Sequence, residues 1–436
     1  MMKKPLPALY TDILILGGGL TGLSTAYHLE KQGFTDYLVV EKNPFFGGLS
    51  ASEQIKGFTF DYSGHLLHLR DPYAVSLVKK LLRGNLIKHT RKAFIDFNGR
   101  HVPFPFQANL WALPKKVADE CVSGAQTASN YPHKKPKNFE QWCLQVFGAG
   151  IYKYFFKPYN TKLWQISPEK LTWDWCGDFV PRLDLKQITA GAKHFSQKQF
   201  GYNSTFYYPR RGGCGALSQA FARYIPNTWL NARVQSIDLK KKCAHINGQT
   251  VYFKRLLNTL PLPALIKMCT NVPLSVKRAA KQLKSVQVNV LQLAVNRTVK
   301  PFHWIYFPQE EVPFFRVGMQ SAFSSENAPC GTTSFYVETS QEITDFKKVK
   351  KAILKALVQK GIIEKQDKIL CSFWRTLSPA YAVYDCQRIA AQRRILSWLV
   401  AKNCLCAGRY GRWEYSFMER SILQGRDIAD QLVKGK

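Results

Sequence analysis

Three glycines near the N-terminus have the spacing of a phosphate-binding turn. Gly17, Gly19 and Gly22 follow the apolar run from Ile13 to Leu16 in a G-x-G-x-x-G pattern. Glycines at this spacing permit a sharp turn, a close approach of a pyrophosphate to the backbone, and close packing of helix on strand. The phosphates would lie at the positive end of the helix that follows. The chemistry predicted here is therefore dinucleotide binding.

Two features that follow the turn narrow the choice of dinucleotide. Glu41 stands at the end of a second apolar run, Tyr37 to Val40. This is about 20 residues beyond the fingerprint, where an acid accepts hydrogen bonds from the ribose hydroxyls and disfavours a 2′-phosphate. The pair Gly47-Gly48 is a further site of close approach, and it favours FAD over NAD. The alternative interpretation of the glycine pattern is an ordinary glycine-rich turn that binds no nucleotide. We predict an FAD site that includes Gly17, Gly19, Gly22, Glu41, Gly47 and Gly48.

The elements around this turn predict an α/β fold with a discontinuous nucleotide domain. Helical periodicity follows the glycines and ends at Gly33, which gives a strand, turn and helix. Short strands return from Ala232 to Leu239, a stretch that contains Val234 as a further predicted FAD contact. We assign residues 8–75, 205–275 and 395–436 to a Rossmann-like FAD-binding domain. Residues 76–204 are expected to form a mostly helical inserted domain, and the alternating segments of 276–394 an antiparallel β-sheet substrate domain.

Length, charge and cysteine content limit the remaining choices. The 436 residues exceed one ordinary core, and Lys and Arg outnumber Asp and Glu by 62 to 29. Such an excess of positive charge is typical of proteins that bind nucleic acid, an anionic membrane or an acidic substrate. Because the chain has no nucleic-acid motif, we expect no nucleic-acid partner and keep weak peripheral membrane contact open. The eleven cysteines include no CxxC, and the N-terminal apolar stretch reads as the first βα unit and not as an export signal. A cytoplasmic protein without a bound metal is expected.

Five longer segments carry a family resemblance: FDYSGHLLH at 60–68, PYNTKLW at 158–164, YNSTFYYPRRGG at 202–213, WIYFPQEEVPFFR at 304–316 and AGRYGRWEY at 407–415. On these segments the chain resembles, nearly end to end, the FAD-binding superfamily of amine oxidases, protoporphyrinogen oxidase and UDP-galactopyranose mutase. Within it, the chain is most similar to the mutase and its relatives. The resemblance implies an FAD-dependent oxidoreductase or mutase-like enzyme. In the mutases, reduced flavin attacks the anomeric carbon of a nucleotide sugar; an external donor would prime it, and no electrons are consumed per turnover.

The resemblance also implies roles for individual residues. His65 matches a histidine beside the flavin, and Arg409 an FAD-contacting arginine at the last strand. Arg316 matches a diphosphate-clamping arginine, a role that suits the planar guanidinium fork. His65 and Arg316 are the implied catalytic pair. For the other matched pocket residues, core packing is the alternative to ligand contact; they are Asn160, Trp164, Asn203, Tyr306, Tyr381 and Tyr415.

The chain departs from the mutase pattern at three positions. Phe179 stands where the mutases have a second diphosphate arginine, with Arg182 three residues further on. Phe323 replaces a substrate tyrosine. Glu419 replaces a neutral asparagine, and an acid that faced a diphosphate would repel it. The flavin half of the site therefore matches the family more fully than the substrate half.

Two other functions stay open at this point. The first is an FAD-dependent oxidase or desaturase, in which oxidised flavin accepts a hydride; an aromatic pocket of Phe155, Phe156, Phe179 and Phe323 would favour it. The same fold serves both chemistries. The second is a flavoprotein whose basic surface docks it to a membrane or to a glycan-assembly complex.

Overall fold

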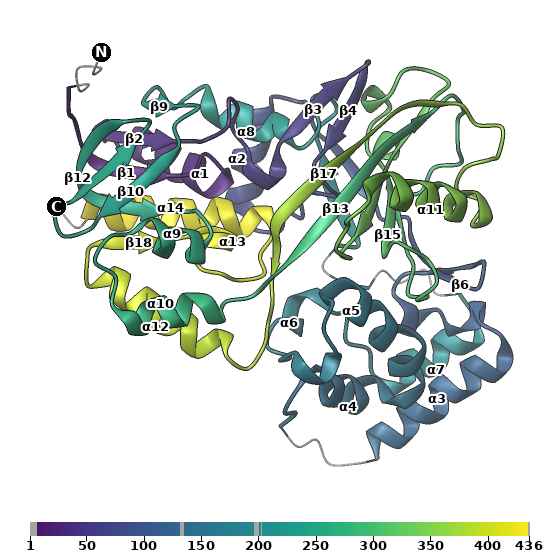
Figure 1. Ribbon diagram of the computed structural model, residues 1–436. Coiled ribbons are helices and arrows are strands. Elements are labelled where there is room, and N and C mark those ends of the chain that lie inside the picture. Colours follow the sequence, from purple (N-terminus) through teal and green to yellow (C-terminus); the bar gives the residue numbers. More distant parts are fainter. Residues whose placement is uncertain (1–6, 131–134, 196–199, 202, 435–436) are drawn as a thin grey trace.

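The structure is a computed structural model that describes residues 7–130, 135–195, 200–201 and 203–434. Figure 1 shows a nucleotide-type sheet on the left, a long antiparallel sheet on the upper right and a helical part on the lower right. Strand β1 (Leu9–Leu16), near the start of the described chain, and helix α14 (Met418–Lys434), at its end, both lie on the left. The predicted α/β class, with helices around a Rossmann-like sheet and a separate antiparallel sheet, is confirmed.

The first sheet has the order β10-β11-β12-β1-β2-β9, and β18 pairs with the end of β12. Strand β1 lies between β12 and β2 and is parallel to both. Its residues Ile13 to Leu16 are fully buried, which explains the continuous apolar run in the sequence. The strands are β1 (Leu9–Leu16), β2 (Tyr37–Val40), β9 (Thr228–Trp229), β10 (Val234–Asp238), β11 (Cys243–Ile246), β12 (Gln249–Asn258) and β18 (Cys404–Cys406).

Helices cover both faces of this sheet. Ile13 and Ile15 point to a core shared with α1 (Leu20–Lys31) and α14 (Met418–Lys434). Leu14 and Leu16 point to the opposite core, which the following helices complete: α9 (Leu262–Met268), α10 (Leu274–Gln282) and α12 (Arg388–Val400). The expected domain limits at 276 and 394 therefore fall inside helices that pack on the nucleotide sheet.

The second sheet has the order β17-β13-β16-β15-β14-β6-β7. Its strands are β17 (Ile369–Ala382), β13 (Ser285–Val295), β16 (Thr333–Thr339), β15 (Arg316–Met319), β14 (Trp304–Tyr306), β6 (Ala93–Phe97) and β7 (Arg100–Pro103). All neighbours are antiparallel except β14 and β6. Helix α11 (Phe346–Gln359) covers one face through Ile353 and Leu357. Two strands of this sheet thus come from the segment 76–204, ahead of its helices.

The helical part contains α3 (Lys115–Ser129), α4 (Phe139–Ile151), a π-helical turn (Tyr152–Phe156), α5 (Lys157–Trp164), α6 (Cys176–Phe179) and α7 (Leu185–Lys193). Helices α3 and α4 touch backbone to backbone. A Cβ at Gly148, whose φ is +80°, would lie 2.2 Å from the backbone of Gly124. Glycine is therefore required where these helices cross.

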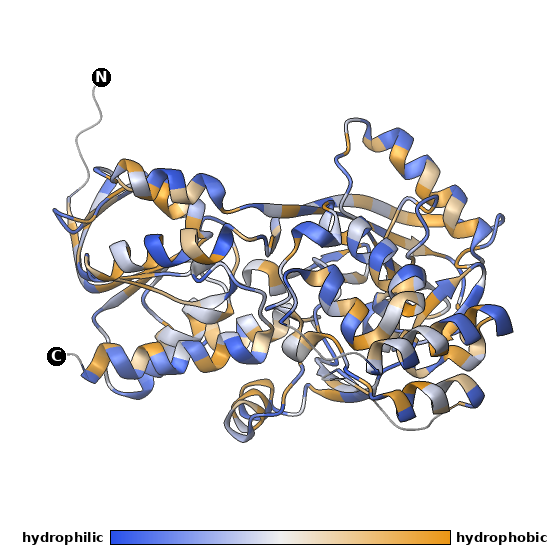
Figure 2. Cartoon of the chain, turned by 90° about the horizontal axis from the view of Figure 1, so that it is seen from below, coloured by the Kyte–Doolittle hydropathy of each residue, from blue (hydrophilic) through white to orange (hydrophobic). Residues whose placement is uncertain are grey.

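Smaller elements join the three parts. Strands β3 (Ser52–Ile55) and β4 (Phe58–Asp61) form a hairpin that follows β2 in the chain, and α2 (Pro72–Leu82) comes next. Strand β5 (Ile87–Thr90) pairs with β8 (Thr205–Tyr208), which precedes α8 (Gly215–Ala222) in the chain. Figure 2 shows hydrophilic and hydrophobic residues in alternation along the outer helices, as expected for helices with one face on a core. Among the described residues, no helix is both long and apolar enough to span a bilayer.

Candidate active site

A cavity of about 780 Å³ lies where the two sheets and the helical part meet. Its walls include Gly19 from the nucleotide sheet, Arg316 and Tyr381 from the second sheet, and Trp164 and Phe179 from the helical part. A site at the junction of domains, with aromatic walls and a few charged groups, is typical of cofactor and substrate binding. The cavity has a nucleotide end, a middle part and a substrate end, which are described in turn.

The nucleotide end is the turn between β1 and α1. Gly17 has a φ of +101°, and a Cβ at Gly22 would lie 2.2 Å from the Gly17 carbonyl oxygen, so both positions need glycine. Gly22 does not line the cavity; it packs helix against strand. Gly19 does line it, and the N-terminus of α1 has no side-chain cap there. The first N–H groups of α1 are therefore available to an anion.

Glu41 and the second glycine pair lie beside this turn. The Glu41 carboxylate accepts from the N–H groups of Gly18 and Asn43, both at 2.9 Å, which fixes it at the cavity wall. Gly47 and Gly48 have φ values of +124° and +56°, and the Gly47 N–H donates to the Gly18 carbonyl at 2.8 Å. The structure thus brings the two glycine groups into one cradle.

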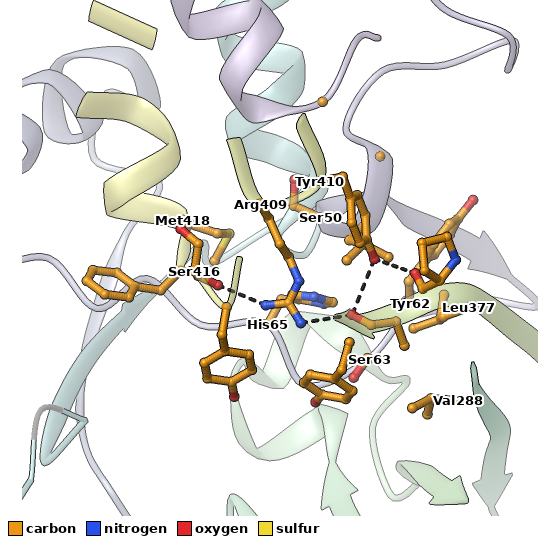
Figure 3. A pocket seen from close by; sticks show the side chains of 18 of the residues that line it. Ser50, Tyr62, Ser63, His65, Val288, Leu377, Arg409, Tyr410, Ser416 and Met418 are labelled. Atoms are coloured by element: carbon orange, nitrogen blue, oxygen red, sulfur yellow. Dashed lines mark hydrogen bonds between the residues drawn. The ribbon is translucent and has the colours of Figure 1, made fainter. Parts of the chain in front are cut away.

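Val234 lines the cavity from β10. The middle of the cavity is lined by His65 and Arg409 (Figure 3). Arg409 donates to the carbonyl oxygens of Ser416 at 2.9 Å and Ala380 at 2.8 Å. Its Nε is buried and has no hydrogen-bond partner within the described part of the chain. Because a buried charged donor is costly to leave unsatisfied, this atom indicates that a ligand completes the site.

His65 lies near the guanidinium of Arg409 in this part of the cavity (Figure 3). Burial, and next the positive charge of Arg409, lower its pKa to about 4, so the ring is neutral at pH 7. Its buried Nδ1 has no hydrogen-bond partner among the described residues. Gly64, just before it, is fixed by packing, because a Cβ there would lie 2.2 Å from the Tyr336 hydroxyl.

We expect the protein to lose stability as the pH falls from 7 to 5. Burial lowers the pKa values of His65 and His68 to about 4 and that of His303 to about 3. Between these values and the ordinary 6.5, the unfolded chain binds more protons than the folded one, so acid favours unfolding. Each histidine contributes a loss of about 2 kcal/mol at pH 5. Urea unfolding at pH 7, 6 and 5 measures this; an unfolding free energy independent of pH over that range would contradict it.

The substrate end is organised by an ion pair between two strands. Arg316 in β15 lies opposite Glu338 in β16. The guanidinium donates to both carboxylate oxygens, through Nε to one and through Nη2 to the other, the latter at 2.9 Å. Burial alone would lower the pKa of Arg316, but the Glu338 carboxylate holds it well above its ordinary value. Ser63, two residues before His65, also donates to Glu338. The cation is therefore permanent, and it is tied to the histidine turn.

The other predicted substrate residues line the same cavity. Tyr381 and Tyr415 stack with ring centroids 5.7 Å apart, and the Arg409 guanidinium lies about 5 Å from both rings. Trp164 donates to the Asn160 side-chain oxygen at 3.2 Å. The remaining two lining residues are Tyr306, beside Arg316 in the sheet register, and Asn203, which accepts from Arg91.

Two expectations about the departures, at Glu419 and Phe323, are corrected by the geometry. Glu419 does not face the cavity; its carboxylate accepts from the backbone N–H groups of Arg70 and Asp71. Phe323 is fully buried beside Tyr208 and is not part of the cavity wall. Arg182 lies over the ring of Trp142, 5.3 Å from its centroid, and does not line the cavity.

Phe179 itself does line the cavity, with Phe155 and Phe156. Its ring meets the ring of Tyr415 edge-on at 4.2 Å between centroids. The cavity wall around Phe179 is therefore apolar, as the sequence indicated. The Glu419 carboxylate, which was expected to face the substrate, is not part of this wall.

Glu338 is a lining residue that the sequence analysis missed. It is 1% exposed, in a strand whose other residues are also buried. A single acid within the run TSFYVET was the available signal, since a buried carboxylate needs a cationic partner. Ser63 and Tyr159, which also line the cavity, gave no comparable signal.

A family model described as flavin containing amine oxidoreductase matches residues 20–433. The chain belongs to this family. It is an FAD-dependent enzyme, and the predicted cofactor and family resemblance are confirmed.

Two solved structures are similar to this protein over almost its whole length. The structure of reduced UDP-galactopyranose mutase has a TM-score of 0.92 at 26% identity, covering 98% of this chain and 96% of that one. A putrescine oxidase bound to putrescine has a TM-score of 0.63 at 16% identity, covering 98% and 100%, which is a likeness of fold alone.

Curated relatives match over shorter stretches. A protein of Klebsiella pneumoniae named as a probable UDP-galactopyranose mutase is 24% identical over 37% of this chain, and the match spans 42% of that protein. A flavin-containing monoamine oxidase A named as probable, from Dictyostelium discoideum, is 28% identical over 30% of this chain, and this match spans 30% of its length.

The residues of the cavity fit FAD. The uncapped α1 N-terminus beside Gly19 suits the pyrophosphate, and the Glu41 carboxylate suits the ribose hydroxyls. The buried Nε of Arg409 and Nδ1 of His65, both without partners within the described ranges, are polar groups that a flavin ring can satisfy. The described residues contain no cluster of three His, Cys, Asp or Glu side chains that could hold a metal ion.

Proposed function

We propose that this flavoenzyme acts, through reduced FAD, on a nucleotide-activated sugar, in the manner of UDP-galactopyranose mutase. The observation that carries the proposal is the end-to-end likeness to the structure of the reduced mutase, with a TM-score of 0.92 and 26% identity. Over the same length, the putrescine oxidase fits with a TM-score of only 0.63. The substrate end of the cavity supports the proposal through its permanent cation.

Arg316 is suited to hold a phosphate of the substrate. Glu338 takes the Nε and Nη2 donors of its guanidinium, which leaves the Nη1 donors for an anion in the cavity. A guanidinium already fixed by a carboxylate loses little rotational freedom when it binds. We therefore assign Arg316 the binding of the diphosphate, and Glu338 the orientation of Arg316.

Tyrosine hydroxyls complete the substrate end as neutral donors. Burial raises the pKa of Tyr306 and Tyr381, so both keep their protons at neutral pH. Such hydroxyls can donate to phosphate oxygens or sugar hydroxyls but cannot serve as bases. A bound, reduced FAD would supply the nucleophile for the anomeric carbon. His65 is neutral at pH 7 and therefore adds no positive charge next to the Arg409 guanidinium.

An oxidase or desaturase is the second candidate. The rings of Phe155, Phe156 and Phe179 make part of the wall apolar. The match to a monoamine oxidase at 28% identity over 142 residues also favours this chemistry. Such an enzyme would pass a hydride from an amine or a lipophilic carbon acid to oxidised FAD, without a need for the charged Arg316–Glu338 pair.

We expect UDP to bind saturably to the dithionite-reduced protein and more weakly to the oxidised protein. The Arg316 guanidinium supplies the anion contact, and the preference for the reduced form follows if the site is adapted to reduced-flavin chemistry. We expect the Kd of the reduced form to be about ten-fold lower, which corresponds to about 1.4 kcal/mol. Flavin absorbance and fluorescence during titration with UDP and UDP-sugars provide the readout.

Adenosine, which lacks phosphate, is the control ligand for this titration. If neither redox state responds to UDP, and if added amines instead generate hydrogen peroxide with the oxidised protein, the nucleotide-sugar proposal is overturned in favour of the oxidase.

A further inference from the structure

The face of the molecule formed by α10 and α12 has a charge pattern that the active site does not explain. These two helices pack side by side beneath the nucleotide sheet (Figure 1). The sequence contains no Asp or Glu from residue 239 to residue 309, a stretch that includes all of α10. The face formed by the outward residues of both helices is called here the α10–α12 face.

On α10 the outward residues combine cations with one large apolar side chain. Lys277, Arg278 and Lys281 are exposed, and they share one side of the helix with Leu274, since the spacings are three, four and seven residues. Leu274 is 70% exposed, although α10 has its own buried side through Val276. The helix therefore presents an apolar residue among cations.

On α12 the pattern repeats. Ile389, Arg393 and Val400 lie on one stripe, at spacings of four and seven residues, and Arg394 is beside them. Val400 is 59% exposed and Ile389 is 44% exposed. Isolated exposed apolar residues are common, but three of them set among cations on two adjacent helices form a mixed surface.

The few acids near this face are already paired with other cations. Asp385 pairs with Lys284 at 3.2 Å, and Asp174 pairs with Arg388 at 2.6 Å. Within the described ranges, no carboxylate lies within ion-pair distance of Lys277, Arg278, Lys281, Arg393 or Arg394. The positive charge of the α10–α12 face is therefore not compensated by any carboxylate in the described part of the chain.

We propose that the α10–α12 face docks the protein on an anionic phospholipid surface. Lys and Arg at such a surface are attracted to acidic head groups, while side chains such as Leu, Ile and Val enter the boundary with the acyl chains. A polyanion in solution would use the cations but would leave the three apolar side chains in water. The mixed chemistry of this face thus selects a membrane.

The test uses the full-length, FAD-loaded protein and sedimentation with vesicles. We expect binding to phosphatidylcholine vesicles that contain about 30% phosphatidylglycerol, and release in about 1 M salt, where the screening length is about 3 Å. The variant Lys277→Gln/Arg278→Gln/Arg393→Gln/Arg394→Gln should bind about 100-fold more weakly. The variant Leu274→Ser/Val400→Ser should also bind more weakly, and its remaining binding should be more sensitive to salt.

Helix α11 offers a matched control with the same change in net charge. Lys347, Lys348, Lys351 and Lys355 are exposed on it, at the other end of the molecule in Figure 1. Their replacement by Gln should leave vesicle binding within about two-fold of the wild type. The flavin spectrum of every variant should match that of the wild type, since none of the changed residues lines the cavity.

The proposal is overturned if the wild-type protein does not bind the anionic vesicles, or if the α11 control loses as much binding, which would indicate an effect of net charge alone. It is also overturned if Leu274→Ser/Val400→Ser binds vesicles as the wild type does and the protein binds DNA or heparin more strongly than vesicles. These outcomes do not depend on which substrate the active site takes.

Discussion

The double variant Arg316→Met/Glu338→Gln is expected to lose nucleotide binding while it keeps its fold and its FAD. Removal of one partner of a buried, hydrogen-bonded charge pair costs about 2 to 5 kcal/mol in binding, so the Kd for UDP should rise at least about 30-fold. Arg316→Ala alone would leave the Glu338 carboxylate buried without its cation, at a cost of about 3 to 5 kcal/mol in stability. The double change removes both charges and separates the two effects.

UDP titration of the reduced protein, followed through the flavin, measures this loss. Arg182→Met is the matched control, because it also removes one guanidinium, but one that lies over Trp142 and outside the cavity. We expect the control to bind UDP like the wild type. If the double variant retains wild-type affinity, Arg316 is not the phosphate ligand, and the oxidase becomes the better account of the site.

The nucleotide half of the site could be predicted from sequence because its information is local. Gly17, Gly19 and Gly22 act within a single turn, and their roles follow from backbone geometry alone. Glu41 and the Gly47-Gly48 pair come from the next strand and loop, which are tied to the same turn by short hydrogen bonds. A strand, a turn and a helix in sequence order were therefore enough to predict where a dinucleotide would bind.

The substrate half depends on contacts between distant segments, which the periodicity of each segment does not reveal. Arg316 and Glu338 meet only because β15 and β16 pair in one particular register. Residues 93–103 look like part of a helical segment, yet they join the second sheet through the parallel pair of β6 and β14. The long strand β17 contains Ser378 and Pro379, residues that weaken the strand pattern, and it was not distinguished in the sequence.

Family resemblance located positions but not the directions of their side chains. Glu419 matches a pocket position, yet its carboxylate turns to the backbone N–H groups that precede α2. The N–H groups of Arg70 and Asp71 precede α2 and have no hydrogen-bond partner inside that helix. A carboxylate that accepts from them stabilises the start of α2, which is a structural reason for an acid at position 419. The repulsion predicted for Glu419 disappears for this reason, whereas the apolar wall at Phe179 remains.

Gly19→Val is expected to give a folded protein that does not retain FAD. A Cβ at Gly19 would meet no heavy atom within 4 Å among the described residues, and the φ of −77° is open to any residue. The space that the side chain would enter is the one in front of the α1 N-terminus, where the pyrophosphate belongs. We expect the Kd for FAD to rise at least about 100-fold, which is about 2.8 kcal/mol.

The absorbance ratio of flavin to protein after gel filtration, with circular dichroism of the same sample, separates cofactor loss from unfolding. Gly177→Val is the matched control, since a Cβ at Gly177 also meets no heavy atom within 4 Å among the described residues, but this glycine does not line the cavity. Gly22→Val provides the contrast: its Cβ would lie 2.2 Å from the Gly17 carbonyl oxygen, so we expect it to disturb the fold itself. If Gly19→Val binds FAD with wild-type affinity, the pyrophosphate does not approach the backbone at Gly19, and the glycine turn serves only to connect β1 to α1.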